Sequence, residues 1–252
     1  MKVSIIIPAR MAATRFPGKP LFRINGKPMI QWVYERAASA GTGTVIVATD
    51  SEEILACVED FGGLARLTRA DHENGTQRIA EVAKDLETDL VINVQGDEPC
   101  IHPDAIKAVI SCLKAHPTME MATLAEEIRD SHSIFNPNVV KLVTDKHNRA
   151  IYFSRAPIPY YKHPGMDSPS WPHDPDKAPA YLRHVGVYGF RKDFLLRYVE
   201  EPPCDLERIE GLEQLRALYM GAAIGVAITT HPSIGVDTPQ DVQKAQDYLN
   251  LI

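Results

Sequence analysis

The sequence predicts an α/β fold, with a mostly parallel sheet flanked by helices. Short apolar runs such as residues 3–7 and 90–94 suit strands that are buried on both faces. Segments with helical periodicity separate these runs at short intervals, as βαβ units require. The length of 252 residues is enough for one large domain, with about residues 130–200 as a hairpin and loop excursion within it.

The first half of the chain alternates strands and helices. Branched apolar residues predict the first strand at 3–7, which Pro8 ends, and boundary signals mark the helices that follow. Ser51 and Asn74 can cap helices, Gly62-Gly63 can stop one, and Pro103 can open one. We therefore predict helices over residues 28–40, 52–60, 74–86 and 103–116, and further strands over 45–48, 64–67, 90–94 and 120–124.

The pattern changes after Asn136. Two apolar runs around a polar turn predict a hairpin, and residues 156–180 hold seven prolines, as a long loop over the site or beside a second subunit would. The chain then returns to regular elements. The predicted strands are 139–144, 150–154, 184–190 and 224–229, and the predicted helices are 192–199, 206–220 and 239–249.

Composition excludes several classes of protein. The formal net charge is −6, from 27 basic and 33 acidic residues, which argues against a nucleic-acid-binding surface. There is no long apolar span and no signal peptide, so we expect no membrane association. The four cysteines form no C-x-x-C pair, and a reducing cytoplasm is the expected location.

Residues 9–19 form a basic loop of small residues directly after the first strand. Arg10, Arg15 and Lys19 supply three cations where backbone N–H groups are free, which favours a polyphosphate site over a merely solvated loop. The loop is neither of two familiar phosphate-binding motifs. Ala12-Ala13 replaces the glycines of G-x-G-x-x-G, and Gly18-Lys19 precedes Pro20 where a P-loop has Ser or Thr.

Two aspartates are candidate ligands of a divalent cation. Asp97 follows the strand at 90–94, and Asp237 lies far along the chain in Gly-Val-Asp-Thr-Pro. Asp237 alone reads better as a turn or capping acid. Together with Asp97 and the polyphosphate loop, however, it predicts a Mg²⁺ site, because Mg²⁺ prefers one or two carboxylates completed by substrate phosphates and water.

Polar residues elsewhere are candidates for substrate contacts. Residues 71–78 form a polar helix start in which Gly75 allows close approach of a ribose or base, although Asn74 can also serve as a simple cap. The pattern holds neither a nucleophilic triad nor a Cys/His metal cluster. Further donors and acceptors, each of which is more typical of a structural or exposed residue when taken singly, are Arg155, His184, Tyr188, Glu210, Glu213 and Gln214.

The motifs together closely resemble a known family. In chain order they are IPARMAATRFPGKPL, NGKPMI, VATD, TRADHENGTQR, NVQGDEP, MATL, FNPNVVK, YFSRAPIP, RHVGVYGFR, LEQLRAL and GVDTP. They are similar to those of the 3-deoxy-manno-octulosonate cytidylyltransferases, the CMP-Kdo synthetases of Gram-negative bacteria, over essentially the whole chain. The resemblance implies a nucleotidyltransferase-type, Rossmann-like fold in a cytoplasmic homodimer.

The resemblance also implies a reaction and roles for residues. CMP would pass from CTP to the anomeric hydroxyl of 3-deoxy-D-manno-octulosonate (Kdo), giving pyrophosphate and an activated sugar for lipopolysaccharide assembly. Asp97 and Asp237 would hold Mg²⁺ and, with Lys19 and Arg10, act in catalysis. Nucleotide-binding residues would be Ala9, Arg10, Arg15, Lys19, Asn74, Gly75 and Thr76. Sugar-binding residues would be Arg78, Gln95, Arg155, His184, Tyr188, Glu210, Glu213 and Gln214, with Arg155 or Arg78 pairing with the sugar carboxylate.

Two stretches depart from the family pattern. Gln77 stands where the family usually has an acid before the arginine, which bears on the choice between Kdo and its 8-amino analogue. Residues 162–180 match no motif of the family.

Other functions remain open at this stage. A CMP-sialic acid synthetase shares the chemistry but lacks the RHVGVYGFR and LEQLRAL runs in this form. A nucleotide-sugar glycosyltransferase would use Gly96-Asp97-Glu98 as a metal motif and release no pyrophosphate. A non-catalytic regulator would bind CTP without turnover.

Overall fold

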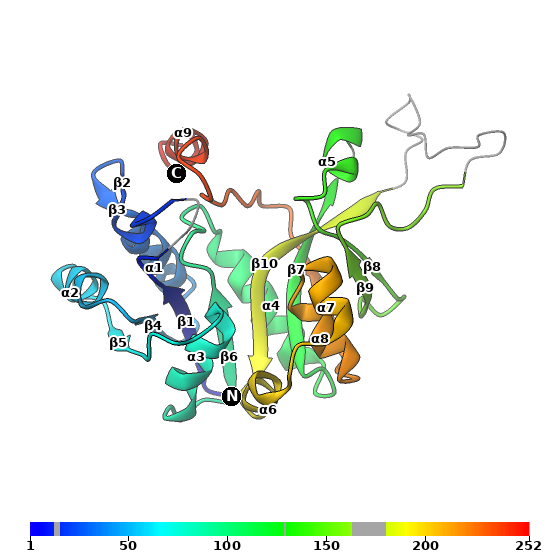
Figure 1. Cartoon of the computed structure of the whole chain (residues 1–252), viewed down its shortest axis with the longest axis horizontal. Coiled ribbons are helices and arrows are strands. Elements are labelled where there is room, and N and C mark those ends of the chain that lie inside the picture. The colour runs from blue at the N-terminus through cyan, green and yellow to red at the C-terminus, as the bar shows by residue number, and fades with distance from the viewer. Residues whose placement is uncertain (13–15, 129, 163–179, 252) are drawn as a thin grey trace.

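The computed structural model describes residues 1–12, 16–128, 130–162 and 180–251 (Figure 1). This described part of the chain forms a nine-stranded sheet. Seven of the strands follow the order β11-β7-β10-β6-β1-β4-β5, and the other two are β8, which pairs with β10, and β9, which pairs with β8. The strands are β1 (Val3–Ala9), β4 (Thr44–Thr49), β5 (Ala65–Leu67), β6 (Leu90–Val94), β7 (Met121–Ile128), β8 (Lys141–Thr144), β9 (Ala150–Ser154), β10 (Tyr181–Arg191) and β11 (Ile224–Ile228). The predicted α/β class is therefore confirmed.

Helices cover both faces of the sheet, as buried parallel strands require. One face packs against α1 (Met29–Ser39), α2 (Glu52–Asp60) and α4 (Pro103–Ala115). The other packs against α3 (Gly75–Lys84), α6 (Lys192–Glu200) and α8 (Gln214–Tyr219). Alternate residues of β1 divide between the two cores, with Ile5 and Ile7 on one side and Ile6 on the other. This alternation explains why the strand reads as a continuous apolar run.

The long strand β10 makes the sheet mixed rather than wholly parallel. It lies between β6 and β7 and runs antiparallel to both, whereas β1, β4, β5 and β6 are mutually parallel. It also starts at Tyr181, three residues earlier than predicted. Because β10 runs in the opposite direction, its start lies at the edge where β1 and β6 end, and His184 is therefore placed near that edge.

Several predicted boundaries are wrong for identifiable reasons. Pro8 does not end β1, which continues to Ala9. At Pro8 the strand pairs with β4 but no longer with β6, whose pairing with β1 ends at Ile6. A missing backbone N–H is tolerated where a strand is paired on one side only. The predicted helix over 206–220 is two helices, α7 (Asp205–Glu210) and α8, separated at Gly211. Gly211 has a φ of 62°, a left-handed conformation that ends α7. The last helix, α9 (Asp241–Leu249), begins after Pro239 rather than at it.

Short elements near the ends of longer ones were not predicted. They are the 3₁₀ helix η1 (Lys19–Leu21), the small hairpin of β2 (Arg23–Ile24) and β3 (Lys27–Pro28), and α5 (Ser131–Phe135). The C-terminal helix α9 packs its apolar side on β2 and the start of α1 (Figure 1). The segment that contains Asp237 thereby lies beside Lys19 of η1 and the loop after β6.

The excursion is shorter than the predicted range of about 130–200. Within the described residues, α5, β8 and β9 stand to one side of the sheet, whereas β10 and α6 belong to the main body (Figure 1). The buried Lys141 fastens its base, since its Nζ donates to the carbonyls of Asn136, Val139 and Arg155 at 2.6–3.0 Å. The proline-rich stretch predicted as a long loop lies mostly outside the described residues.

Candidate active site

A cavity of about 310 Å³ lies at the edge of the sheet where β1 and β6 end. Ligands of parallel sheets bind at this edge because the strand ends leave backbone groups and loops free there. Most of the predicted nucleotide and metal residues line the cavity: Ala9, Arg10, Lys19, Asn74, Gly75, Asp97 and Asp237. Two predicted sugar-binding residues, Arg78 and Gln95, line it as well. The remaining lining residues are Pro8, Phe16, Pro20, His72 and Gly96. Arg15 lies outside the described residues.

Two glycines allow the walls of the cavity to close around Pro8. A Cβ at Gly96 would lie 2.7 Å from the carbonyl oxygen of Pro8, a separation that real Cβ atoms do not show. A Cβ at Gly75 would lie 3.0 Å from Pro8 Cγ. The loop after β6 and the start of α3 therefore approach β1 closely because both positions lack a side chain.

Lys19 joins the two predicted metal ligands. Its Nζ lies 2.5 Å from Asp97 Oδ2 and 3.5 Å from Asp237 Oδ1. A backbone hydrogen bond from Val236 N to Asp97 O, at 2.8 Å, fixes the two acidic segments side by side. The two aspartates are 140 positions apart in the chain, yet both carboxylates face the ammonium group of Lys19 near the C-terminal end of β6.

Glu98 follows Asp97 directly but does not line the cavity. Its Oε2 accepts a 2.7 Å hydrogen bond from Ser233 Oγ, which ties the segment before Asp237 to the loop after β6. Burial and, to a lesser extent, the nearby Asp97 carboxylate raise the pKa of Glu98 to about 7. Glu98 thus lies beside Asp97 and Asp237 in an acidic part of the fold.

The residues present fit a bound Mg²⁺. Asp97 and Asp237 offer carboxylate oxygens, which are the ligands that this hard cation prefers, and both lie within 3.5 Å of the single Lys19 nitrogen. The ammonium group thus marks the point on which the two carboxylates converge. Two protein carboxylates leave the other positions of an octahedral ion to phosphate oxygens and water.

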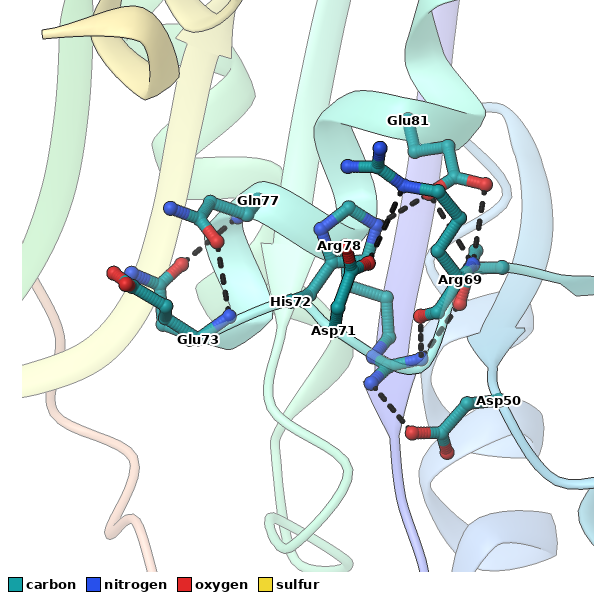
Figure 2. A network of polar contacts seen from close by, with 10 residues as sticks. Asp50, Arg69, Asp71, His72, Glu73, Gln77, Arg78 and Glu81 are labelled. Atoms are coloured by element: carbon teal, nitrogen blue, oxygen red, sulfur yellow. Dashed lines mark hydrogen bonds and ion pairs between the residues drawn. The ribbon is translucent and has the colours of Figure 1, made fainter.

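The start of α3 forms the opposite wall of the cavity. Asn74 caps this helix, since its Oδ1 accepts from Gln77 N at 2.9 Å. Gln77 in turn folds back and accepts from Glu73 N at 2.9 Å (Figure 2). Thr76 is not a cavity residue, because its hydroxyl donates to Glu213 Oε1 at 2.7 Å on the side of α8. Of the predicted nucleotide residues in this motif, Asn74 and Gly75 therefore face the cavity.

Arg78 lines the cavity, but its guanidinium group is already occupied. Nη2 donates to Asp50 Oδ2 at 2.9 Å, and Nη1 donates to Thr68 Oγ1 at 2.6 Å and Arg69 O at 3.4 Å (Figure 2). The side chain is buried. The predicted pairing of Arg78 with a sugar carboxylate is therefore not supported, and Arg78 instead joins α3 to the ends of β4 and β5.

A second polar cluster lies between the sheet and α8. Tyr188 faces Asn93 across the β10–β6 pair, and its hydroxyl donates to Gln214 Oε1 at 3.3 Å. Gln95 links this cluster to the cavity, because its Nε2 donates to Asn93 Oδ1 at 3.3 Å. The structure thus gathers four predicted sugar-binding residues, Gln95, Tyr188, Glu213 and Gln214, in or beside the cavity, with His184 in ring contact with Tyr188.

The predicted sugar contacts of Arg155 and Glu210 are not supported. Glu210 accepts from Ser154 Oγ at 2.6 Å and from Arg155 N at 2.9 Å. The Arg155 guanidinium group donates to backbone carbonyls of Glu210, Pro137 and Gly211. These two residues fasten the excursion to α7.

Two residues that the sequence did not single out also belong here. Asn93 is fully buried, accepts from Gln95 and leaves Nδ2 without a partner among the described residues. His72 lines the cavity at the start of α3. A polar residue inside the apolar run of β6 was the available signal for Asn93, whereas His72 had no signal beyond its place in the motif.

His184 gives the fold a specific pH dependence. Its ring contacts Phe153 and Tyr188, and its Nε2 lies 2.9 Å from Thr123 Oγ1. Burial lowers the pKa of His184 to about 4, so the unfolded chain binds this proton more readily than the folded one. This contribution to stability is therefore present above pH 6.5 and is lost as the pH falls from about 6.5 towards 4, by at most about 1.4 kcal/mol per pH unit.

We expect His184→Gln to show a smaller loss of unfolding free energy than the wild type between pH 7 and pH 5. Urea unfolding at a series of pH values measures this difference. His147→Gln, at an exposed turn, is the matched control and should follow the wild-type curve. Parallel curves for wild type and His184→Gln would contradict the assignment.

Comparison with known proteins agrees with this geometry. The family model for cytidylyltransferases matches residues 4–224. The 3-deoxy-manno-octulosonate cytidylyltransferase of Pelobacter propionicus is 49% identical over 253 residues, covering 100% of this chain and 99% of the relative. That of Geobacter sulfurreducens is 47% identical over 250 residues, covering 99% of this chain and 100% of the relative.

Solved structures give the same result. A structure of CMP:2-keto-3-deoxy-manno-octonic acid synthetase complexed with CTP matches with a TM-score of 0.89 and 41% identity, covering 100% of this chain and 99% of that one. A 4-diphosphocytidyl-2C-methyl-D-erythritol synthase from Anaerococcus prevotii, at 15% identity and a TM-score of 0.63, shares the fold alone. The cavity, its paired aspartates and these full-length matches together show that the chain belongs to the 3-deoxy-manno-octulosonate cytidylyltransferase family.

Proposed function

We propose that this protein transfers CMP from CTP to the anomeric hydroxyl of Kdo and releases pyrophosphate. The observation that carries the proposal is the convergence of Asp97 and Asp237 on Lys19, inside a cavity that continues through Gln95 into a polar cluster. Relatives of nearly half-identical sequence have the name of this activity, and one homologous structure is complexed with CTP. The product would be an activated sugar for lipopolysaccharide assembly.

The cavity divides naturally between the parts of the substrates. Arg10 and Lys19 give its outer side positive charge, which suits the triphosphate. The start of α3, with Asn74 and Gly75, suits the nucleoside. The sugar would lie towards Gln95 and Tyr188, beside the α-phosphate. Binding both substrates at one edge of a rigid sheet supplies the proximity that a bimolecular transfer needs.

The reaction itself requires no covalent intermediate with the protein. The sugar hydroxyl oxygen forms a bond to the α-phosphorus of CTP, the bond from that phosphorus to the bridging oxygen breaks, and the hydroxyl proton is lost as pyrophosphate leaves. Asp97 and Asp237 would hold Mg²⁺, which supplies charge neutralisation and lowers the pKa of a coordinated hydroxyl. Lys19 and Arg10 would stabilise charge on the leaving phosphates.

We extend the proposal to the assembly and location of the protein. Exposed apolar side chains occur on the excursion and on α7, namely Ile151, Tyr160, Leu206 and Ile209, and would suit the contact surface of a homodimer. Sedimentation velocity measures the oligomeric state directly, and a monomer at micromolar concentration would contradict the homodimer.

The four cysteines form no disulfides with one another, which is consistent with a reducing cytoplasm. The described residues contain no helix that is long and apolar enough to cross a membrane.

Pyrophosphate release tests the reaction. The assay contains Mg²⁺, CTP and Kdo, with ATP, GTP and UTP as alternative nucleotides and with 8-amino-Kdo and sialic acid as alternative acceptors. We expect release that depends on both CTP and Kdo. Release with the amino sugar alone would keep the chemistry and turn attention to Gln77. No release with any sugar would favour a glycosyltransferase or a regulator.

Lys19→Ala tests the assignment of the phosphate side. The variant loses an ammonium group that would pair with the triphosphate, and the remaining carboxylates repel the substrate more strongly. We expect the KM for CTP to rise about tenfold or more, with a smaller change in the KM for Kdo. Initial rates over a matrix of both substrates separate the two effects. A change confined to Kdo would show that the phosphate lies elsewhere.

A further inference from the structure

The end of the cavity away from the two aspartates contains a histidine that the mechanism above does not use. His72 lines the cavity, and its side chain is only 6% exposed. Its Nε2 is hydrogen-bonded to Glu81 Oε2 on α3. Figure 2 shows the imidazole with this nitrogen directed at Glu81 and the other turned away from it, towards the side of Gln77. A buried imidazole that lines a cavity and has one nitrogen fixed by a hydrogen bond can use its other nitrogen to bind a ligand selectively.

Glu81 is itself held in place. Its two carboxylate oxygens each accept from the backbone N–H of Arg69 at 3.3 Å, and the Arg69 side chain approaches one of them at 3.7 Å. A carboxylate only accepts hydrogen bonds, so the nitrogen of His72 that faces it carries the proton. In the neutral ring the other nitrogen, Nδ1, is then an acceptor. Glu81 thus sets both the orientation and the tautomer of His72.

The other polar side chains at this end have partners already. Asn74 Oδ1 accepts from Gln77 N, and the Arg78 guanidinium group bonds to Asp50, Thr68 and the Arg69 carbonyl. Within the described part of the chain, the His72 ring is hydrogen-bonded through Nε2 and not through Nδ1. His72 Nδ1 is therefore an acceptor at this end that no described residue occupies.

A cytidine nucleotide presents the donor that this acceptor requires. Cytosine and uracil differ at position 4, where cytosine has an amino group and uracil a carbonyl oxygen. An acceptor facing that position binds the amine and repels the carbonyl, so a single lone pair discriminates between the two bases. The cations and aspartates at the other end of the cavity place the triphosphate there, which leaves the base for the end formed by His72.

We propose that His72 is a specificity-determining residue that accepts a hydrogen bond from the 4-amino group of cytosine through Nδ1, with Glu81 as the positioning residue that fixes its tautomer. The inference rests on the proposed use of CTP as substrate. It goes beyond that function because it assigns the choice of base to one side-chain atom.

Binding of two nucleotides tests the assignment. The probes are CTP and the triphosphate of pyrimidin-2-one riboside, which differs from CTP only in lacking the 4-amino group. Calorimetry gives Kd for each with wild type, His72→Asn and His72→Gln. The Asn side chain can place its oxygen near the position of Nδ1, whereas the longer Gln side chain reaches the position of Nε2. His147→Gln, at an exposed turn, is the control for substitution of a histidine.

We expect wild type and the control to bind CTP roughly 10- to 100-fold more tightly than the analogue. His72→Asn should retain much of this preference, and His72→Gln should bind the two nucleotides about equally, through a loss of CTP affinity. Equal preference in wild type and both His72 variants would overturn the inference. If wild type binds no CTP, the proposed function itself fails, which the same titration shows separately.

A second measurement does not depend on any variant. Nitrogen NMR of protein with labelled histidine reports which ring nitrogen carries the proton. We expect His72 in the wild type to be neutral, with the proton on Nε2. A proton on Nδ1, in either the neutral or the charged ring, would remove the acceptor and overturn the proposal.

Discussion

Asp97→Asn is expected to lower kcat about 1,000-fold while leaving the fold intact. The substitution keeps the size of the side chain but removes the charge that would hold Mg²⁺ and that now faces Lys19 at 2.5 Å. An amide is a weak ligand for this cation, and the remaining carboxylate at Asp237 cannot replace the second one. Pyrophosphate release at saturating CTP and Kdo, over a series of Mg²⁺ concentrations, measures both the loss and any shift in metal dependence.

The control for this experiment is Asp104→Asn. Asp104 is exposed on the first turn of α4, where its ion pair with Lys107 is a surface contact. This variant should retain wild-type turnover, and both variants should retain the wild-type circular dichroism spectrum. Near-normal turnover in Asp97→Asn would remove Asp97 from the metal site and leave the convergence on Lys19 as a structural ion pair.

The second large effect is expected at Lys141, which no substrate needs to touch. Lys141→Met should lower the free energy of unfolding by about 3 kcal/mol, and hence the Tm by roughly 6–12 °C. The ammonium group is fully buried and donates to three backbone carbonyls at the base of the excursion. Methionine fills a similar volume, so the loss would come from the carbonyls left without a donor. Thermal unfolding followed by circular dichroism measures it.

Lys146→Met is the matched control, because Lys146 is exposed in the turn between β8 and β9. We expect it to change stability by less than about 0.5 kcal/mol. Equal shifts for the two variants would mean that the carbonyls around Lys141 find other donors, such as water. In that case the excursion would not depend on this lysine.

Elements with strong local signals were predicted well. Ser51 caps α2 as expected, accepting from Ile54 N, and the helix occupies the predicted residues 52–60. Asn74 caps α3 in the same way. The apolar run of β6 was also placed correctly at residues 90–94. In each case the signal and the structure it specifies lie within a few residues of each other.

Elements whose form depends on distant partners were predicted less well. An apolar pattern identifies β10 as a strand, but its direction depends on the path by which the chain returns from the excursion. The break at Gly211 likewise follows from separate attachments. Glu210 at the end of α7 is bonded to Ser154 and Arg155, while Leu215 in α8 is buried in the core.

The sequence by itself predicted which types of residue line the cavity. A basic loop, two aspartates after strands and glycines at close approaches follow from residue type and position, and they led to the cavity where the structure places them. It also identified the family, because the motifs match it in order along the whole chain.

Only the tertiary structure decided which polar side chains are already engaged by the fold. In the sequence, Arg78 and Arg155 look like cations that could bind a substrate, yet each donates three hydrogen bonds to partners inside the fold. His72, which had no distinguishing signal, is hydrogen-bonded through Nε2 to Glu81. The physical reason is that hydrogen-bond saturation and burial depend on neighbours such as Asp50, 28 residues from Arg78, that only folding brings within reach.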